Sequence, residues 1–347
     1  MNFVKNQLKL FFLTMISFQM VNANATQKEA PKSVVALGDS ITAGAIAHLT
    51  RQDGYNPLLL PKILGMIAQF GIQRSMEAFE IRSYSWAAGL DKEYRVDSHS
   101  QRLKFLADRQ NKKSYHFNAA VSGARTSRFP DQLEKIEKWV KKNPKEHKPE
   151  HAIMLMGPND VCSDNLERMT KTDLYFDRFE KTISSLRTMN PEIKVLLVGT
   201  PNLEHLRKTA KDSNVGFLKC KQIWEKAGYC DNILVEKDPE KRAQVDQRVR
   251  DYNQALEDLA ARFNNVTGED SVRASTSIYD LKFTDDDVSV DCFHPNRSGQ
   301  NLLAETSFED SWWKDDFQDL KSEYNKKKSA AIRAERRAKR KRSVFRK

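Results

Sequence analysis

A chain of 347 residues, 39% hydrophobic and 30% charged, is long enough for one large α/β domain or two small ones, with a core that needs no disulfide to be stable. At this length we expect one domain. No segment reaches the roughly 20 apolar residues of a transmembrane helix. The formal net charge of +11 belongs to residues 321–347, which carry 13 Lys/Arg and two Glu. Residues 1–320 therefore have no net charge, and they create no electrostatic field that would select anionic substrates.

The first 25 residues are typical of a secretory signal peptide. Lys5 and Lys9 accompany a mostly apolar stretch at 10–21, and Ala23-Asn24-Ala25 forms a small-residue cleavage site. The apolar stretch is too short and too interrupted to span a bilayer. We therefore expect an exported protein, periplasmic or secreted, whose signal peptide is cleaved after Ala25.

Short apolar runs alternate with longer amphipathic stretches along the body of the chain. Buried strands of four to eight residues that alternate with helices are typical of a parallel sheet covered on both faces. We therefore predict a doubly wound α/β fold in residues 26–320, a three-layer α/β/α sandwich with a mostly parallel five-stranded sheet. The predicted strands are residues 34–37, 79–86, 116–120, 152–156 and 195–198.

Two stretches in the second half of the chain have the period of a helix with one buried stripe. Residues 201–240 between them show no clear period and contain two cysteines, so we expect an insertion near the C-terminal edge of the sheet that shapes a binding pocket. The helical stripes consist of Phe176, Phe179, Ile183 and Leu186, and of Val245, Val249, Tyr252, Leu256, Leu259 and Phe263.

Four short motifs lie where an open parallel sheet places its ligands, beyond the carboxyl ends of the strands. Taken singly, a Gly-Asp-Ser turn or an Asn-Asp pair is common in loops that cap helices. Their occurrence together, in this order, indicates one site. The motifs are Gly38-Asp39-Ser40, the segment from Asn118 to Gly123, Gly157-Pro158-Asn159-Asp160, and Asp291-Cys292-Phe293-His294.

The first and last motifs contain the parts of an activated serine nucleophile. A neutral imidazole at His294 can take the proton of Ser40 and later deliver it to the leaving alcohol, while Asp291 accepts the other ring N–H and fixes the tautomer. The structural alternatives are a loop histidine packed against Pro295 and an Asp291 that caps a helix. The residues themselves therefore indicate ester hydrolysis by attack of Ser40.

The four motifs resemble those of the SGNH, or GDSL, hydrolase family, whose blocks contribute Ser, Gly, Asn and His. The resemblance extends over about residues 33–305 and is closest to the phospholipase B-like GDSL lipases. It implies that Gly123 and the amide of Asn159 join the backbone N–H of Ser40 in an oxyanion hole. One departure is Pro158, which stands where this branch usually has a second glycine and which removes an N–H.

Three polar residues of the motifs are expected to support the site rather than react. Asp39 and Asp160 can fix their turns by hydrogen bonds from side chain to backbone, and Asn118 is a turn former.

Export places the four cysteines in an oxidising compartment, where an even number suggests two disulfides among three possible pairings. Cys220 and Cys230 bracket a short segment, while Cys162 and Cys292 each lie in a motif of the expected site. We therefore predict the bonds 162–292 and 220–230, with free or mispaired thiols as the alternative. No Cys/His cluster has the spacing of zinc ligands, and we predict neither a metal nor another cofactor.

The signal peptide and the resemblance together imply an exported serine esterase or lipase acting on lipid acyl esters through an acyl-enzyme on Ser40. The alternatives are a carbohydrate O-acetyl esterase, an acyltransferase on the same fold, and a non-catalytic module that binds the cell envelope. The basic segment 321–347 is expected to be disordered or a frayed helix that contacts an anionic membrane or envelope surface, or a plain solubilising tail. We expect no nucleic-acid partner, and the sequence leaves the oligomeric state open.

Overall fold

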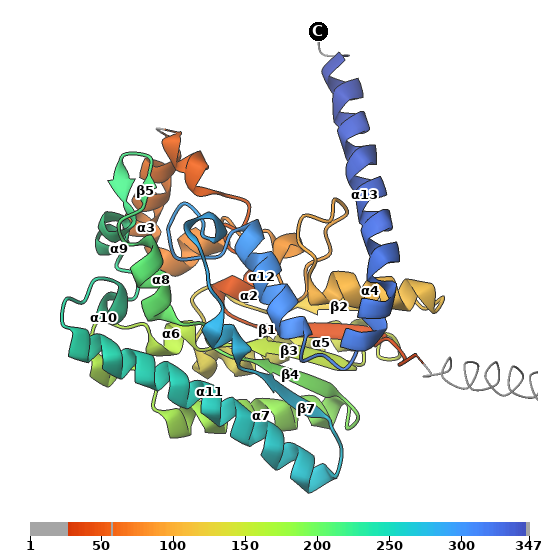
Figure 1. Cartoon of the computed structure of the whole chain (residues 1–347). Helices are drawn as coiled ribbons and strands as arrows, with labels where there is room; N and C mark the ends of the chain where they lie inside the picture. Colours follow the sequence, from red (N-terminus) through yellow and green to blue (C-terminus); the bar gives the residue numbers. More distant parts are fainter. Residues whose placement is uncertain (1–26, 57, 345–347) are drawn as a thin grey trace, which may run out of the picture.

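The computed structural model describes residues 27–56 and 58–344, so the predicted signal peptide lies outside the described part. Five strands form a parallel sheet in the order β2-β1-β3-β4-β7 (Figure 1). This arrangement is the predicted doubly wound α/β fold. The strands are β1 (Ser33–Gly38), β2 (Tyr115–Asn118), β3 (His151–Leu155), β4 (Lys194–Val198) and β7 (Val272–Ser275).

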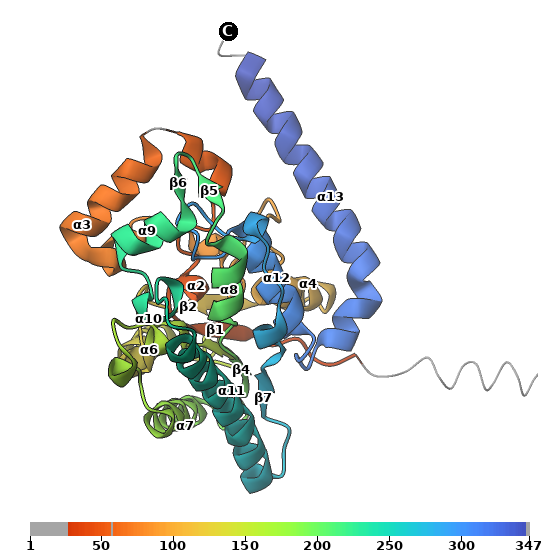
Figure 2. The ribbon, with the colours of Figure 1, turned by 60° about the vertical axis from the view of Figure 1, so that its left-hand side comes forward.

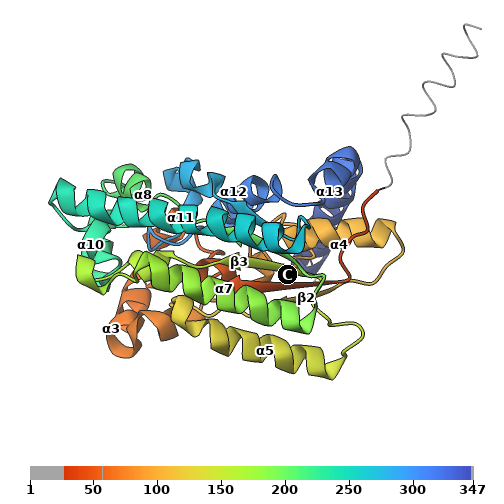
Figure 3. The same cartoon turned by 90° about the horizontal axis from the view of Figure 1, so that it is seen from below.

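Each face of the sheet has its own hydrophobic core, because neighbouring residues of a strand point to opposite faces. On one face, Val35 and Leu37 of β1 pack in a cluster with α5 (Phe129–Lys142), α7 (Thr172–Met189) and α11 (Pro239–Thr267). These three helices lie side by side in Figure 3. The six residues of β1 are all buried, which explains why the strand reads as a continuous apolar run.

The other face of the sheet is covered by three helices that lie above it in Figure 1. Val34 and Ala36 of β1 share a cluster there with α4 (His99–Arg109), α12 (Arg297–Phe308) and α13 (Lys314–Val344). Five large aromatic side chains are buried in this cluster; they are Trp86, Phe308, Trp312, Trp313 and Phe317.

The predicted strand at 79–86 was wrong. Its backbone pairs with the loop after β1 rather than with the sheet, since Ile46 N donates to the carbonyl of Phe79 and Ile81 N to that of Gly44. Residues Arg82–Tyr84 then form a 3₁₀ turn. The fifth strand is β7, an edge strand whose sequence Val-Arg-Ala-Ser offers no apolar run and was not predicted.

The predicted domain boundary at residue 321 falls inside α13, which continues without interruption to Val344. Phe317 and Tyr324 bury their rings against Phe105 of α4, so the first half of the helix belongs to the body. Lys328 also pairs with Asp97. Glu335 in the second half pairs with Arg95 at 3.4 Å, and the end of the helix projects from the body in both Figure 1 and Figure 2.

Buried histidines on the α12 side of the sheet make one part of the folding free energy sensitive to acid. Burial lowers the pKa of His151 to about 4. The unfolded chain therefore binds more protons than the folded one between about pH 6.5 and 4, so this histidine destabilises the fold as the pH falls through that window. Burial raises the pKa of Asp39 to about 7, which acts in the opposite direction over much of the same range.

The contribution of His151 is therefore isolated by comparing the wild type with His151→Asn. We expect the variant to gain on the order of 2 kcal/mol relative to the wild type between pH 7.5 and pH 4.5, because it has no imidazole to protonate. Urea unfolding followed by circular dichroism at both pH values measures the difference. An offset between the two proteins that does not change with pH would contradict the expectation.

Candidate active site

The candidate nucleophile lies where β1 turns into a single helical turn, α2 (Ser40–Ala43). Asp39 caps this turn by accepting a hydrogen bond from Ile41 N at 2.9 Å. A Cβ on Gly38 would lie 2.3 Å from the Thr42 hydroxyl and 2.7 Å from the Leu155 carbonyl oxygen, so only glycine fits at the end of the strand. The Gln132 amide holds Gly38 further, by hydrogen bonds of 2.8 Å to its N–H and to its carbonyl.

The structure brings Ser40, His294 and Asp291 together in a hydrogen-bonded relay. His294 Nε2 lies 2.8 Å from Ser40 Oγ, and His294 Nδ1 lies 2.6 Å from Asp291 Oδ2. The other carboxylate oxygen, Asp291 Oδ1, accepts from the backbone N–H groups of Phe293 and His294, each at 3.1 Å. All three side chains are buried, so water competes little for these bonds. This arrangement can transfer the serine proton to the imidazole.

A tight loop holds Asp291 and His294 on the same side. Cys292 between them has a left-handed backbone with φ 59°, and Ser289 N donates to the His294 carbonyl at 2.8 Å. The Ser289 hydroxyl contacts the carbonyls of Ile46 and Leu49, which follow the nucleophile turn. The loop is therefore tied directly to the segment that carries Ser40.

Gly123 and Asn159 line the same cleft as Ser40 and His294. Gly123 has a φ of 72°, which glycine adopts without strain. Asn159 lies in α6 (Pro158–Val161), and its side-chain amide donates to the Ala124 carbonyl at 3.1 Å, which fixes the amide next to the Gly123 turn. Pro158 is the first residue of α6, a position at which a backbone N–H has no partner within the helix, so the proline removes no hydrogen bond of that helix.

The three expected supporting residues have structural partners. Asn118 donates to the Thr42 carbonyl at 2.8 Å and accepts from Ala120 N, which joins the end of β2 to the nucleophile turn. Asp160 accepts from the hydroxyl groups of Thr126 and Thr170, at 2.7 and 2.8 Å. Burial raises the pKa of Asp160, while the bonds from Thr126 lower it.

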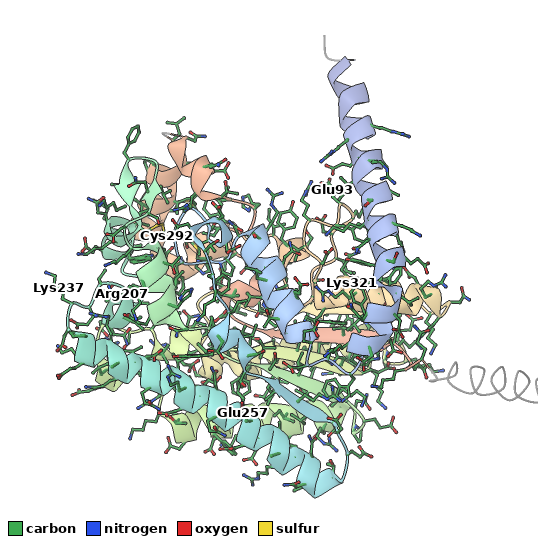
Figure 4. All side chains as sticks on the ribbon, in the orientation of Figure 1. Glu93, Arg207, Lys237, Glu257, Cys292 and Lys321 are labelled. Carbon is green, nitrogen blue, oxygen red and sulfur yellow. A yellow bond between two sulfur atoms is a disulfide. The ribbon has the colours of Figure 1, made fainter. Side chains whose placement is uncertain are left out.

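The predicted disulfide pairing was wrong. The bonds join Cys162 to Cys230 and Cys220 to Cys292. Residues Cys220–Ala227 form the helix α9, whose length of about 10 Å separates Cys220 at its start from the segment that carries Cys230, beyond the reach of a disulfide. Cys292 instead lies against the α8–α9 side of the molecule, where it is labelled in Figure 4. One bond therefore anchors the loop of Asp291 and His294 to α9.

The relay opens on a cleft of about 290 Å³ with charged side chains at its rim. Arg125 donates to the carbonyl of Cys162 at 3.2 Å, and Arg168 pairs with Asp164 at 2.6 Å. Asp231 at the start of α10 (Asp231–Leu234) adds a second carboxylate, whose pKa is raised by partial burial and by Asp164. Except for Met76, Tyr229 and Phe293, the wall offers mostly polar, charged or glycine residues.

A second, smaller cavity of about 30 Å³ lies on the other side of Phe293, which lines both spaces. Ile41 and Pro295, the residues that follow Ser40 and His294, also line this cavity. The remaining walls are apolar apart from one amide side chain and come from Pro201, Asn202, Leu203, Leu206, Phe283, Val288 and Leu303. Ser40 and His294 thus line the charged cleft, while the residues that directly follow them line the apolar cavity.

Sequence reasoning missed Tyr229, which is buried in the wall of the cleft. Burial, followed by the charge and hydrogen bond of Asp291, raises the pKa of Tyr229 well above its ordinary value. Its ring stacks on Phe293 with centroids 5.5 Å apart. Tyr229 belongs to the insertion predicted at 201–240. We expected this insertion to shape the pocket, but its sequence has no helical or strand period that would mark a single residue.

The model of the GDSL-like Lipase/Acylhydrolase family matches residues 34–306. The chain belongs to this family. No curated protein sequence matches this GDSL-like hydrolase significantly.

Two solved structures illustrate its neighbours. A family 3 carbohydrate esterase from Clostridium thermocellum is 13% identical, covers 83% of this chain and 98% of its own, and has a TM-score of 0.42. An extracellular lipase from Streptomyces rimosus is 13% identical, with 80% and 99% covered and a TM-score of 0.40. The family assignment rests on the family model.

Within residues 27–56 and 58–344, no group of three or more His, Cys, Asp or Glu side chains is placed to hold a metal ion. Within the same residues, no helix is long and apolar enough to cross a membrane. Two disulfides are typical of an oxidising, exported environment.

Proposed function

We propose that this GDSL-like hydrolase cleaves carboxylic esters through an acyl-enzyme on Ser40. The observation that carries the proposal is the continuous relay from Ser40 Oγ through both nitrogens of His294 to Asp291, with separations of 2.8 and 2.6 Å. His294 Nε2 takes the hydroxyl proton as Ser40 Oγ bonds to the ester carbonyl carbon, and Asp291 stabilises the imidazolium that forms.

The carbonyl oxygen becomes negatively charged when Ser40 attacks. We assign its stabilisation to the N–H groups of Ser40 and Gly123 and to the amide of Asn159, each worth on the order of 3 kcal/mol in the barrier. The imidazolium then returns its proton to the leaving alkoxide, and the alcohol departs. Water attacks the acyl-enzyme by the same route, releasing the carboxylic acid and restoring the Ser40 hydroxyl.

We further propose an amphiphilic lipid ester as the substrate, as in the phospholipase B-like branch. The apolar cavity beyond Phe293 suits the start of an acyl chain, since its lining is mostly apolar and includes Ile41 and Pro295, the residues next to Ser40 and His294. The charged rim of the cleft, with Arg125, Arg168 and Asp231, suits a polar headgroup on the alcohol side.

An acetylated carbohydrate is the second candidate substrate. The apolar cavity measures only about 30 Å³, which favours a short acyl group unless its walls move. The polar cleft suits hydroxyl groups as well as it suits a lipid headgroup.

The basic end of α13 is the proposed contact with an anionic membrane or envelope surface. Arg333, Arg336 and Arg337 are exposed there. Each basic residue near an anionic surface contributes about 1 kcal/mol. Export of the protein, with cleavage of the signal peptide after Ala25, belongs to the same proposal.

A panel of p-nitrophenyl esters from acetate to octanoate tests the function and separates the two substrates. We expect turnover that rises with chain length beyond acetate. Leu206→Phe, which fills the apolar cavity, should lower kcat/KM for the octanoate ester by at least about tenfold. Turnover of the acetate ester by the same variant is the control and should change by less than about twofold.

The outcomes of the panel are distinct. An optimum at acetate would favour the carbohydrate ester over the lipid ester. Absence of turnover for every ester would contradict the hydrolase proposal itself.

A further inference from the structure

Two of the most exposed apolar side chains of the molecule lie at one end of it. Phe217 is 92% exposed at the tip of the hairpin formed by β5 (Asn214–Val215) and β6 (Leu218–Lys219). Leu58 is 78% exposed directly before α3 (Leu59–Glu77). The hairpin packs against the 3₁₀ helix η1 (Arg51–Tyr55) that leads to α3, and a Cβ on Gly54 would lie 2.1 Å from the Val215 side chain.

Figures 1 and 2 show the hairpin tip and the start of α3 side by side.

The body holds Phe217 in its exposed position. Gly216 before it has a φ of 58°, as a tight two-residue hairpin turn requires, and Val215 is buried. Directly after β6, Cys220 is bonded to Cys292 and its N–H donates to the Ser213 carbonyl at 2.9 Å. The hairpin is therefore held in place by the body, and the ring of Phe217 stays in water rather than packing against another part of this chain.

Positive charges flank both apolar side chains. Lys62 is exposed one helical turn after Leu58, and Lys219 is exposed two residues after Phe217. Two neighbouring carboxylates have close local partners, since Asp53 accepts from Thr50 and Asp285 pairs with Arg51 at 2.9 Å. A third, Asp286, is exposed and lies 3.8 Å from the same guanidinium.

The free end of α13, with its exposed arginines, extends toward the same side of the molecule as the hairpin in Figures 1 and 2. Apolar tips beside cations are suited to the interface of an anionic bilayer, where the ring enters the acyl boundary and the lysines meet the headgroups.

We propose that Leu58 and Phe217, flanked by Lys62 and Lys219, dock the protein on an anionic lipid bilayer. This docking tip adds apolar insertion to the electrostatic contact of α13, and it rests on the lipid ester as the proposed substrate. The helix α3 begins at the tip and ends near the cleft, where Met76 lines the wall and its sulfur lies 3.9 Å from the Tyr229 hydroxyl. One element therefore connects the membrane contact with the site of hydrolysis.

Cosedimentation of the purified full-length protein with vesicles tests the docking tip. The vesicles contain phosphatidylcholine and phosphatidylglycerol at a ratio of 7 to 3. We expect Leu58→Ser with Phe217→Ser to lower the partition coefficient by roughly tenfold, because insertion of the apolar side chains is lost. The loss should persist in 0.5 M salt, which screens the contribution of the basic helix.

A matched control replaces two exposed apolar residues elsewhere, Leu174→Ser with Val266→Ser, which are 42% and 81% exposed. This control should sediment as the wild type does, and both double variants should hydrolyse a soluble acetate ester at the wild-type rate. Ser40→Ala should also bind vesicles normally, so failure of docking and failure of the hydrolase proposal are distinguishable.

Three outcomes would overturn the proposal. They are wild-type sedimentation of the tip variant, equal losses in both double variants, or a wild-type dimer in solution that the tip variant breaks, because a second copy of the chain would then be the occupant.

Discussion

Ser40→Ala is expected to lower kcat for ester hydrolysis by at least about 10⁴-fold with little change in KM, because it removes the atom that bonds to the substrate. Asp291→Asn should have an effect of similar order. The amide cannot stabilise the imidazolium as a carboxylate does and no longer favours the tautomer in which Nε2 is free to accept a proton. Steady-state kinetics on the best p-nitrophenyl ester measure both effects.

A matched control for these substitutions is Ser184→Ala, which removes a hydroxyl from the exposed side of α7. It should keep the wild-type kcat, and the melting temperature of Ser40→Ala should stay within a few degrees of that of the wild type. Turnover by Ser40→Ala within about tenfold of the wild type would show that another residue is the nucleophile.

Loss of the Cys220–Cys292 bond is expected to affect catalysis more than loss of the Cys162–Cys230 bond. The two bonds span 72 and 68 residues, so chain entropy predicts nearly the same stabilisation, about 4 kcal/mol each. Only Cys292 lies between Asp291 and His294. A displacement of their loop by about 1 Å would lower kcat on the order of 10²-fold.

The comparison uses paired serine substitutions, Cys220→Ser with Cys292→Ser and Cys162→Ser with Cys230→Ser. Urea unfolding should show similar losses of free energy in both. The first pair should lower kcat by about two orders of magnitude, and the second should act mainly on KM, since Cys162 and Cys230 line the cleft. Equal effects on kcat in the two pairs would contradict a positioning role of the Cys220–Cys292 bond.

The sequence contained enough information for the fold class and for the candidate relay. Buried parallel strands such as β1 read as continuous apolar runs, and the loops after them must meet at one edge of the sheet. Ser40 and His294 are 254 residues apart, yet the joint occurrence of the four motifs and their family resemblance were sufficient to predict that they lie together.

Features that depend on contacts between distant segments were not predictable in the same way. The disulfide pairing depended on a helix between Cys220 and Cys230, within a stretch that has no clear period. The edge strand β7 gains its pairing from β4 rather than from its own composition. Tyr229 enters the site because the fold brings the insertion over Asp291, and no local pattern marks such a residue.

The most direct test of the central claim is the mass of the protein during turnover. The purified chain is mixed with a p-nitrophenyl ester, quenched in acid within milliseconds, digested and analysed by mass spectrometry. We expect one acyl group on the peptide that contains Ser40, and none on that peptide in Ser40→Ala. An acyl group on a different residue, or full turnover of Ser40→Ala without any acylated peptide, would contradict the mechanism.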